Sequence, residues 1–470
     1  MYDLAILGGN VALSDSVEVA DVLIKDGAIA QVLPSSGGDG APARAGVHLA
    51  RAKREVDARG MLVMPGVIDP HVHFGLRSRG TVTADDFVSG TRCAAAGGVT
   101  TVIDYADHVP KMTLLQCAEA RLSEIRPLAA VDYSVHQNCI RIDADIGDQL
   151  AELRRGGIAS AKVFTTYKDA GYMLEGGDLQ ALLREAKCHG VLVTVHAEDD
   201  ALIEQARSRL EAFGRVSPTY HGESRPAEAE ERAVGQVIAA SKAANAPVYI
   251  VHVSTSGAVR AIAEARREGQ EVLAETCPHY LLLDEGRYAG ADARLFIMSP
   301  PLRTKADQDA LWAGAAGGDI DTFSTDHCAF TPDQKALGRF CFDTLPGIPG
   351  VQTLLPLIYT YAVATGTITV GQMVKMMCEN PARLFGMSHR KGRIAPGLDA
   401  DIVILDTTAQ HTLNGSELLS EAGYTPYEGM KAACRVREVF LRGNLVAAHG
   451  RFCGADGAGE FVRASQHLPR

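Results

Sequence analysis

The chain has 470 residues, of which 46% are hydrophobic and 22% are charged, as is ordinary for a globular protein with a large core. Its formal net charge of −11, with no stripe of lysine or arginine, disfavours binding to a nucleic-acid backbone. No apolar stretch is long enough to cross a bilayer, so we expect no membrane partner.

Residues 1–60 are predicted to form short strands. Three β-rich runs are separated by turn residues, at 4–9, 20–24 and 28–33. Lys25-Asp26-Gly27 suits a tight hairpin, and residues 34–45, rich in Gly, Pro and Ala, are expected to be a loop. We interpret residues 1–60 as the first part of a small β-sandwich domain.

Residues 61–390 show short apolar runs that alternate with longer segments of helical period. The apolar runs include 99–104, 160–164, 191–196 and 247–252, and the helical segments include 178–189 and 227–244. Runs that are apolar on both faces, each followed by a helix, predict a parallel sheet. The length fits an α/β fold of the (β/α)8 TIM-like barrel type with insertions. A doubly wound open sheet is the alternative, but the sequence has no Gly-x-Gly-x-x-Gly phosphate turn.

Short strands return after residue 391, at 401–405, 436–441 and 444–448. Residues 391–452 are therefore expected to complete the β-sandwich domain, because strands from the two chain ends can cover each other's edges. The tail, 453–470, is rich in Gly and Ala and is a candidate for a subunit interface.

Two features of the sequence suggest a cytoplasmic protein. The ten cysteines are scattered and none pairs as Cys-x-x-Cys, which is typical of reduced thiols. The first residues, Met1 to Leu4, lack the basic start and apolar core of a signal peptide.

Residues of metal-binding type lie at the ends of the predicted barrel strands. His71 and His73 end the first apolar run and would share one face of a strand, because alternate side chains point the same way. Two neutral imidazoles aimed at one point are a good partial metal site. An isolated His-x-His pair is more often incidental, so the prediction depends on the residues that follow.

Four further residues lie in or just after apolar runs: Lys162, His196, His252 and Asp326. Each has a simpler interpretation, as a hydrogen-bonded interior histidine, a helix N-cap, or a lysine that reaches the surface. The C-terminal ends of barrel strands meet in one place, however, and catalytic groups gather there. The six residues together predict a metal site.

Lys162 is the least intuitive member of this set. Burial and neighbouring cations both lower the pKa of an amine, so Lys162 would not keep its ammonium form. A neutral amine can react with carbon dioxide to give a carbamate, whose anionic oxygens could bridge two metal ions.

Sequence motifs extend this pattern over the whole chain. In order, they are PGVIDPHVH (65–73), GTVTADDF (80–87), AGGVTTVIDY (96–105), KVFTTYK (162–168), TVHAED (194–199), YIVHVST (249–255), ETCPHYLLL (275–283), MSPPLR (298–303), STDHCAF (324–330), ENPARLFG (379–386) and KGRIAPGLDADIVILD (391–406). By these motifs the chain resembles the cyclic amidohydrolases of the amidohydrolase superfamily, and most closely the dihydropyrimidinases and hydantoinases.

The resemblance implies two divalent metal ions, zinc or alternatively manganese, held by His71, His73, Lys162, His196, His252 and Asp326. It assigns His71, His73 and Asp326 to the more buried ion. It assigns His196 and His252 to the second ion, with carboxylated Lys162 bridging both ions. It also implies a homotetramer or a homodimer.

The resemblance further assigns the chemistry, which is hydrolytic opening of a dihydropyrimidine or 5-substituted hydantoin to the N-carbamoyl amino acid. Asp326 would accept the proton of the attacking hydroxide and return it to the leaving ring nitrogen, and Tyr167 would hydrogen-bond the carbonyl as it becomes an oxyanion. Ser299 would hold the ring amide through main-chain groups. Phe74 and Phe164 begin two loops that are expected to contact the substrate.

Two departures from the family pattern affect the substrate more than the reaction. Pro346 stands where the family has an asparagine whose carbonyl contacts the substrate N–H, and proline keeps that acceptor but has no N–H. The family's Glu-Asp-Arg after this loop is replaced by Gln352-Thr353-Leu354.

Single residues distinguish this chain from relatives with other functions. Dihydroorotases carry an arginine after the second histidine to grip the substrate carboxylate, whereas this chain has Phe74-Gly75. Arg77 and Arg79 follow in the same loop, either meeting an acidic substituent or standing in solvent. Allantoin or another cyclic ureide or imide is the alternative ring. A non-enzymatic dihydropyrimidinase-related protein would have lost metal ligands, whereas all six positions are filled here.

Overall fold

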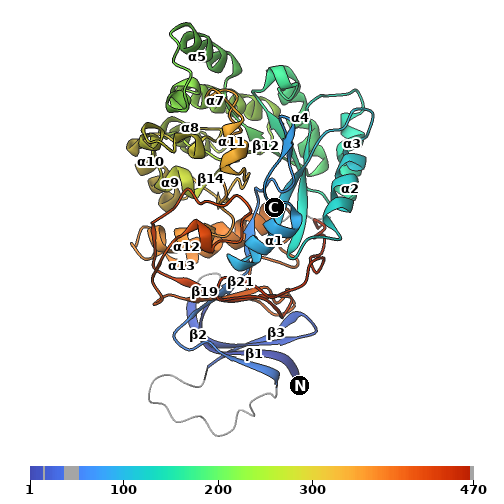
Figure 1. The fold of residues 1–470 in the computed structure, drawn as a ribbon. Helices are drawn as coiled ribbons and strands as arrows, with labels where there is room; N and C mark the ends of the chain where they lie inside the picture. The colour runs from blue at the N-terminus through green and yellow to red at the C-terminus, as the bar shows by residue number, and fades with distance from the viewer. Residues whose placement is uncertain (14–15, 36–51, 466–470) are drawn as a thin grey trace.

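The computed structural model describes residues 1–13, 16–35 and 52–465. A parallel β-barrel is surrounded by helices, and a second sheet built from both chain ends lies at its base in the view of Figure 1. The loop expected at residues 34–45 lies almost entirely outside the described residues.

Eight parallel strands of the described chain form the barrel. They are β6 (Val67–Asp69), β9 (Val99–Ala106), β10 (Asp132–Asn138), β11 (Ser160–Phe164), β12 (Leu192–His196), β13 (Val248–Ile250), β14 (Val272–Thr276) and β15 (Thr322–Phe323), in that spatial order. The two edge strands come together where the His73 N–H donates to the His327 carbonyl at 2.8 Å and the Thr325 hydroxyl donates to Asp69. The predicted (β/α)8 barrel is confirmed, and the alternative open sheet is wrong.

Helices cover the outside of the barrel (Figure 1). They are α1 (Phe87–Ala96), α2 (Leu114–Ile125), α3 (Ile146–Arg155), α4 (Gly176–His189), α5 (Asp200–Ala212), α6 (His221–Ser224), α7 (Ala227–Ala244), α8 (Ser256–Arg267), α9 (Pro278–Leu282), α10 (Lys305–Gly317) and α11 (Pro332–Ala336). Local capping sets where helices begin, as at α1, where the Asp86 carboxylate accepts from the backbone N–H groups of Val88 and Ser89. The helices predicted at 178–189 and 227–244 are confirmed as α4 and α7.

Two further helices follow the last barrel strand. One is α12 (Leu354–Ile358) with the π-helical η5 (Tyr359–Val363), and the other is α13 (Val370–Val374), π-helical η6 (Lys375–Glu379) and α14 (Asn380–Leu384). Short 3-10 turns are η1 (Lys168–Ala170), η2 (Pro218–Tyr220), η3 (Glu285–Ala289), η4 (Ala293–Phe296) and η7 (Gly415–Glu417).

The second sheet joins strands from both ends of the chain. They are β1 (Tyr2–Ala12), β2 (Val17–Lys25), β3 (Ala28–Pro34), β4 (Ala52–Asp57), β5 (Leu62–Pro65), β16 (Ile402–Asp406), β19 (Arg435–Leu441), β20 (Asn444–Ala448) and β21 (Arg451–Phe452). β5 pairs in parallel with β1 and antiparallel with β16, which joins the two ends, and residues such as Ile6, Val22 and Ile402 form a separate core. The expected β-structure built from both ends is confirmed. Two small antiparallel sheets have two strands each: β7 (Arg77–Ser78) with β8 (Thr81–Val82), and β17 (His411–Thr412) with β18 (Lys431–Ala432).

The chain passes from the second sheet to the barrel at Gly66. Because β5 belongs to the second sheet, that sheet extends past the boundary expected at residue 60. The Gly66 N–H donates to the Asp401 carbonyl at 2.8 Å, and a Cβ at this position would lie 2.0 Å from Thr100 Oγ1. Only glycine fits this close approach. A single apolar run covers β5 and β6, so the sequence pattern alone does not show where one strand ends and the next begins.

A buried ion cluster ties the second sheet to the barrel. Lys391 Nζ pairs with Asp132, with Asp399 at 2.7 Å and with Asp401 at 2.5 Å. The three carboxylates are close enough together to hold a metal ion, but the lysine already lies among them. The cluster is therefore structural.

Described residues of the tail run along the barrel. The Tyr133 N–H donates to the Glu460 carbonyl at 3.0 Å, and the Val462 N–H donates to the Tyr133 carbonyl at 2.8 Å. The division into domains and a role for this tail at a subunit interface stay predictions.

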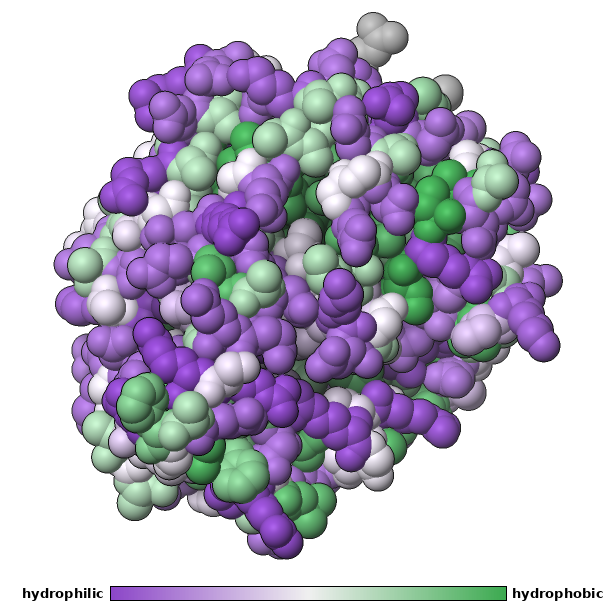
Figure 2. All heavy atoms as spheres, turned by 90° about the horizontal axis from the view of Figure 1, so that it is seen from above, coloured by the Kyte–Doolittle hydropathy of each residue, from purple (hydrophilic) through white to green (hydrophobic). Residues whose placement is uncertain are grey.

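The surface is mainly hydrophilic on the face shown in Figure 2, where apolar side chains lie in small separate groups. Among the described residues, no helix is both long and apolar enough to cross a membrane.

Candidate metal centre and active site

The six side chains predicted as metal ligands come together at the C-terminal ends of the barrel strands. His71 and His73 follow β6, Lys162 lies in β11, His196 ends β12, His252 follows β13 and Asp326 follows β15. All six line one cavity of about 340 Å³. The structure thus gathers residues that are up to 255 positions apart in the chain.

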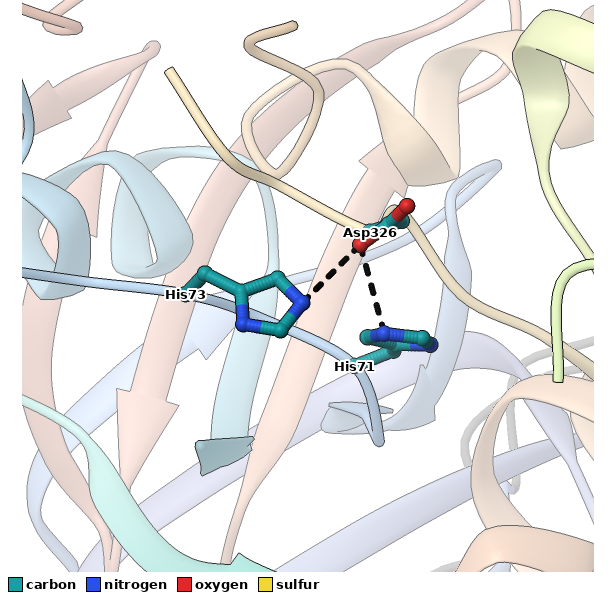
Figure 3. A group of neighbouring side chains, drawn as sticks. All are labelled: His71, His73 and Asp326. Carbon is teal, nitrogen blue, oxygen red and sulfur yellow. Dashed lines mark ion pairs between the residues drawn. The ribbon is translucent and has the colours of Figure 1, made fainter. Parts of the chain in front are cut away.

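Three of these side chains form a compact group (Figure 3). The Nε2 atoms of His71 and His73 lie 3.2 and 3.1 Å from Asp326 Oδ1, and both rings point toward that carboxylate. Ligand atoms of the three residues all lie within 4.8 Å of one another. Two imidazoles and a carboxylate at this spacing suit one divalent cation.

The other three side chains, Lys162, His196 and His252, line the same cavity. The ring centre of His252 is 4.5 Å from that of His196 and 5.5 Å from that of His71. Lys162 is 1% exposed, its Nζ lies 5.0 Å from the centre of the Tyr105 ring, and no hydrogen bond or ion pair of this atom is seen within the described part of the chain. Burial lowers the pKa of Lys162 to about 8, which increases the fraction of the neutral amine that carbamate formation requires.

The protonation states also suit metal ions. Burial lowers the pKa of His71 and His252 well below the usual value and lowers that of His196, so these rings are neutral. Burial would raise the pKa of Asp326, but His71 and His73 outweigh it and hold the pKa at about 2. Neutral imidazoles and an ionised carboxylate are the forms that bind a cation.

Glu275, at the end of β14, orients two of the ligands, and the sequence analysis gave it no role. Its Oε1 accepts from His71 Nδ1 at 2.7 Å, which leaves His71 Nε2 facing Asp326. The same carboxylate accepts from the backbone N–H of His252 at 3.2 Å and from the Tyr249 hydroxyl at 2.8 Å. A carboxylate behind a histidine fixes its tautomer and raises its basicity as a ligand.

A second carboxylate lies behind His196. Glu198 accepts from His196 Nε2 at 2.7 Å, which leaves Nδ1 as the available ligand atom. Glu198 also pairs with Arg225, whose guanidinium lies 5.3 Å from the centre of the Tyr167 ring. Glu198 lies two positions after His196 in the sequence, which was a signal for its role, whereas nothing in the local pattern points to Arg225.

Three cavity-lining residues that follow barrel strands have left-handed backbones, although none is glycine. The φ angles are 64° at Tyr167, 41° at His252 and 47° at Asp326. Such conformations cost about 1–3 kcal/mol each and cluster at functional sites. Here they accompany the sharp turn that the chain makes as it leaves a strand, which brings each side chain to the cavity.

Four of the five expected substrate contacts line the cavity: Phe164, Tyr167, Ser299 and Pro346. Burial raises the pKa of Tyr167, although a hydrogen bond from the Ser299 hydroxyl opposes the rise, so the phenol stays protonated. The Pro346 carbonyl accepts from the Cys328 thiol at 3.8 Å.

Phe74 does not reach the cavity, and the expectation that it contacts the substrate is corrected. Its N–H donates to Asp104 at 2.9 Å, and its ring lies 6.1 Å from Phe87 and 5.2 Å from His327. The side chain is fully buried against α1, where a Cβ on Gly90 would lie 2.4 Å from the ring.

Comparisons with known proteins agree with this geometry. The profile of the amidohydrolase family matches residues 62–446. A D-phenylhydantoinase of Escherichia coli O9:H4 (strain HS) is 36% identical over 468 residues, which are 99% of this chain and 98% of that protein.

Solved structures are similar over the same length. The crystal structure of dihydropyrimidinase from Brevibacillus agri NCHU1002 has a TM-score of 0.93 at 35% identity and covers 100% of both chains. The L-hydantoinase (dihydropyrimidinase) from Arthrobacter aurescens has a TM-score of 0.87 at 27% identity and covers 98% of this chain and 100% of that one. The chain therefore belongs to the amidohydrolase family.

Proposed function

We propose that this protein is a metal-dependent hydrolase that opens a cyclic amide or imide, either a dihydropyrimidine or a 5-substituted hydantoin, to the N-carbamoyl amino acid. The observation that carries the proposal is the His71–His73–Asp326 group, whose ligand atoms lie within 4.8 Å of one another in a cavity with three more ligand-type side chains. The similarity to a D-phenylhydantoinase and a dihydropyrimidinase supports this ring class over allantoin.

Two divalent cations, zinc or manganese, fit this donor set. His71, His73 and Asp326 would hold one ion. His196 and His252 would hold the other ion, and Lys162 would act as a bridging carbamate. Bound there, the ions would lower the pKa of water and polarise the ring carbonyl.

Asp326 is suited to carry the proton. With a pKa of about 2 it is ionised at neutral pH and can accept a proton from the attacking water. The water oxygen bonds to the carbonyl carbon, the ring C–N bond breaks, and the same proton goes to the leaving nitrogen. One water is consumed, its second proton is released to solvent, and the product carries a carboxylate and an N-carbamoyl group.

Tyr167 is suited to stabilise the charge on the carbonyl oxygen. Its phenol is protonated, lines the cavity and lies beside His196, with 5.2 Å between the ring centres. A donor fixed where negative charge develops strengthens its bond as the reaction proceeds.

A turnover panel tests this function. Metal-loaded protein is incubated with dihydrouracil, hydantoin, 5-substituted hydantoins, allantoin and succinimide, with chelator-treated protein as the control. We expect N-carbamoyl amino acids from dihydrouracil or the hydantoins, and none after chelation. Turnover of allantoin alone would favour the alternative ring, and no turnover by metal-saturated protein would reject the proposal.

The homotetramer or homodimer and the cytoplasmic location stay predictions. Light scattering after size-exclusion chromatography measures the first.

A further inference from the structure

A second cavity, of about 180 Å³, adjoins the catalytic cavity. Both cavities are lined by Arg79, Tyr167, Ala170, Ser299 and Pro346, so they meet at these residues. A substituent on a ring held beside Tyr167 can therefore extend into this side cavity.

Most charged groups that line the side cavity already have partners. Arg225 pairs with Glu198, and Arg207 pairs with Glu211 at 3.0 Å and with Glu204 at 3.9 Å. Asp200 accepts from the Thr166 hydroxyl at 2.9 Å. Lys168 and Asp169 are exposed on η1 at the rim.

Arg79 is different, because it has no carboxylate partner in the part of the chain that the structure describes. Its Nη1 donates to the carbonyls of Phe342 at 3.0 Å and Thr344 at 3.3 Å, which holds the guanidinium in place. No described residue uses the edge formed by Nε and Nη2. That edge can take a carboxylate through two parallel hydrogen bonds.

His221 also lines this cavity and has one unsatisfied polar atom. It is 3% exposed, and its Nε2–H donates to the Met298 carbonyl at 2.7 Å. Its Nδ1 is buried and has no hydrogen-bond partner among the described residues. Burial lowers the pKa of His221 to about 3, so the ring is neutral and Nδ1 can only accept. A buried acceptor of this kind is usually satisfied by water or by a ligand N–H or O–H group, so His221 does not itself bind a carboxylate.

We propose that the side cavity binds a carboxylate carried by the ring substituent, with Arg79 as the residue that determines this specificity. The inference rests on the proposed function, since the ring must occupy the catalytic cavity. It defines the substrate class as cyclic amides whose substituent ends in a carboxylate, such as 5-(2-carboxyethyl)hydantoin. Arg79 is exposed, but the two backbone carbonyls that accept from Nη1 hold its guanidinium where the two cavities meet.

The experiment compares 5-(2-carboxyethyl)hydantoin with its uncharged amide, 5-(2-carbamoylethyl)hydantoin, on metal-loaded protein. Both kcat/KM and the dissociation constant from calorimetry are measured for the wild type, Arg79→Gln and Arg209→Gln. Arg209 is an exposed arginine of α5 outside both cavities, so its replacement removes the same charge without touching the site.

We expect the wild type to prefer the acid at least tenfold, and Arg79→Gln to lose about 10- to 100-fold on the acid alone, as for a hydrogen-bonded charge pair. Arg209→Gln should behave as the wild type. Equal use of acid and amide by the wild type, or an equal loss on both in Arg79→Gln, overturns the inference. If neither compound is hydrolysed, the proposed function fails, and the dissociation constants still decide whether Arg79 selects the carboxylate.

Discussion

Replacing Glu275 by glutamine would remove a buried charge behind the metal centre while keeping its shape and its hydrogen bonds. Glu275 is 1% exposed, and its Oε1 lies 2.7 Å from His71 Nδ1. The amide oxygen can still accept from His71. The amide N–H can donate to the Tyr249 hydroxyl, which can donate in turn to Thr322 Oγ1, 2.5 Å away. The change is therefore mainly electrostatic, and it makes His71 a less basic ligand.

The expected loss of metal affinity depends on whether a variant removes the charge of Glu275 alone or also its hydrogen bond to His71. Partners behind metal-binding histidines typically contribute about 10- to 100-fold to metal affinity, or about 1.4–2.8 kcal/mol. Since Glu275→Gln keeps the hydrogen bonds, we expect about a tenfold loss. Glu275→Ala also leaves His71 without its partner, so we expect a loss of about 100-fold.

The assay is competition for zinc against a chromophoric chelator, followed by kcat at saturating metal. Asp321→Asn is the matched control, because Asp321 is a largely buried carboxylate that accepts from the Ala274 N–H of β14 and pairs with Arg266 rather than with a ligand. Its metal affinity should equal that of the wild type. If both Glu275 variants bind zinc as tightly as the wild type, Glu275 does not act through His71 and this reasoning is refuted.

Three further predictions concern other parts of the account. Lys162→Ala should lose metal and activity together and recover both in part with small carboxylic acids; retention of both metal ions and the full rate would remove the carbamate. Tyr167→Phe should lower kcat by about 100- to 1,000-fold with metal content unchanged, and an unaltered kcat would exclude the phenol from the reaction. Lys391→Met should lower the free energy of unfolding in urea by about 3–5 kcal/mol, because it leaves buried carboxylates unpaired. Lys305→Met, at an exposed pair with Asp309, should change it by less than about 0.5 kcal/mol, and equal losses would contradict the role of the cluster.

The barrel and the meeting of the six ligand positions could be predicted from the sequence because all strands of a parallel barrel run in the same direction. Residues at the C-terminal ends of these strands therefore lie at the same end of the barrel. His196 and His252 lie at or just after strand ends, and every such end in a barrel faces the same mouth. No distance needed to be known for this inference.

The same rule failed for Phe74, which also follows a barrel strand. Its direction depends on the contact of its N–H with Asp104 and on the space that Gly90 leaves on α1, and neither is visible in a local pattern. Arg225 was missed for a related reason, since its role comes from Glu198 and Tyr167, which are distant in sequence. Contacts between separate segments, not strand order, decide such positions.

Anomalous diffraction from crystals of the zinc-loaded protein tests the central claim most directly. The account predicts two peaks, one at the His71–His73–Asp326 group and one beside His252, with density extending from Lys162 Nζ between them. A single peak in active crystals, or Lys162 with an unmodified amine directed away from the metal, would contradict it.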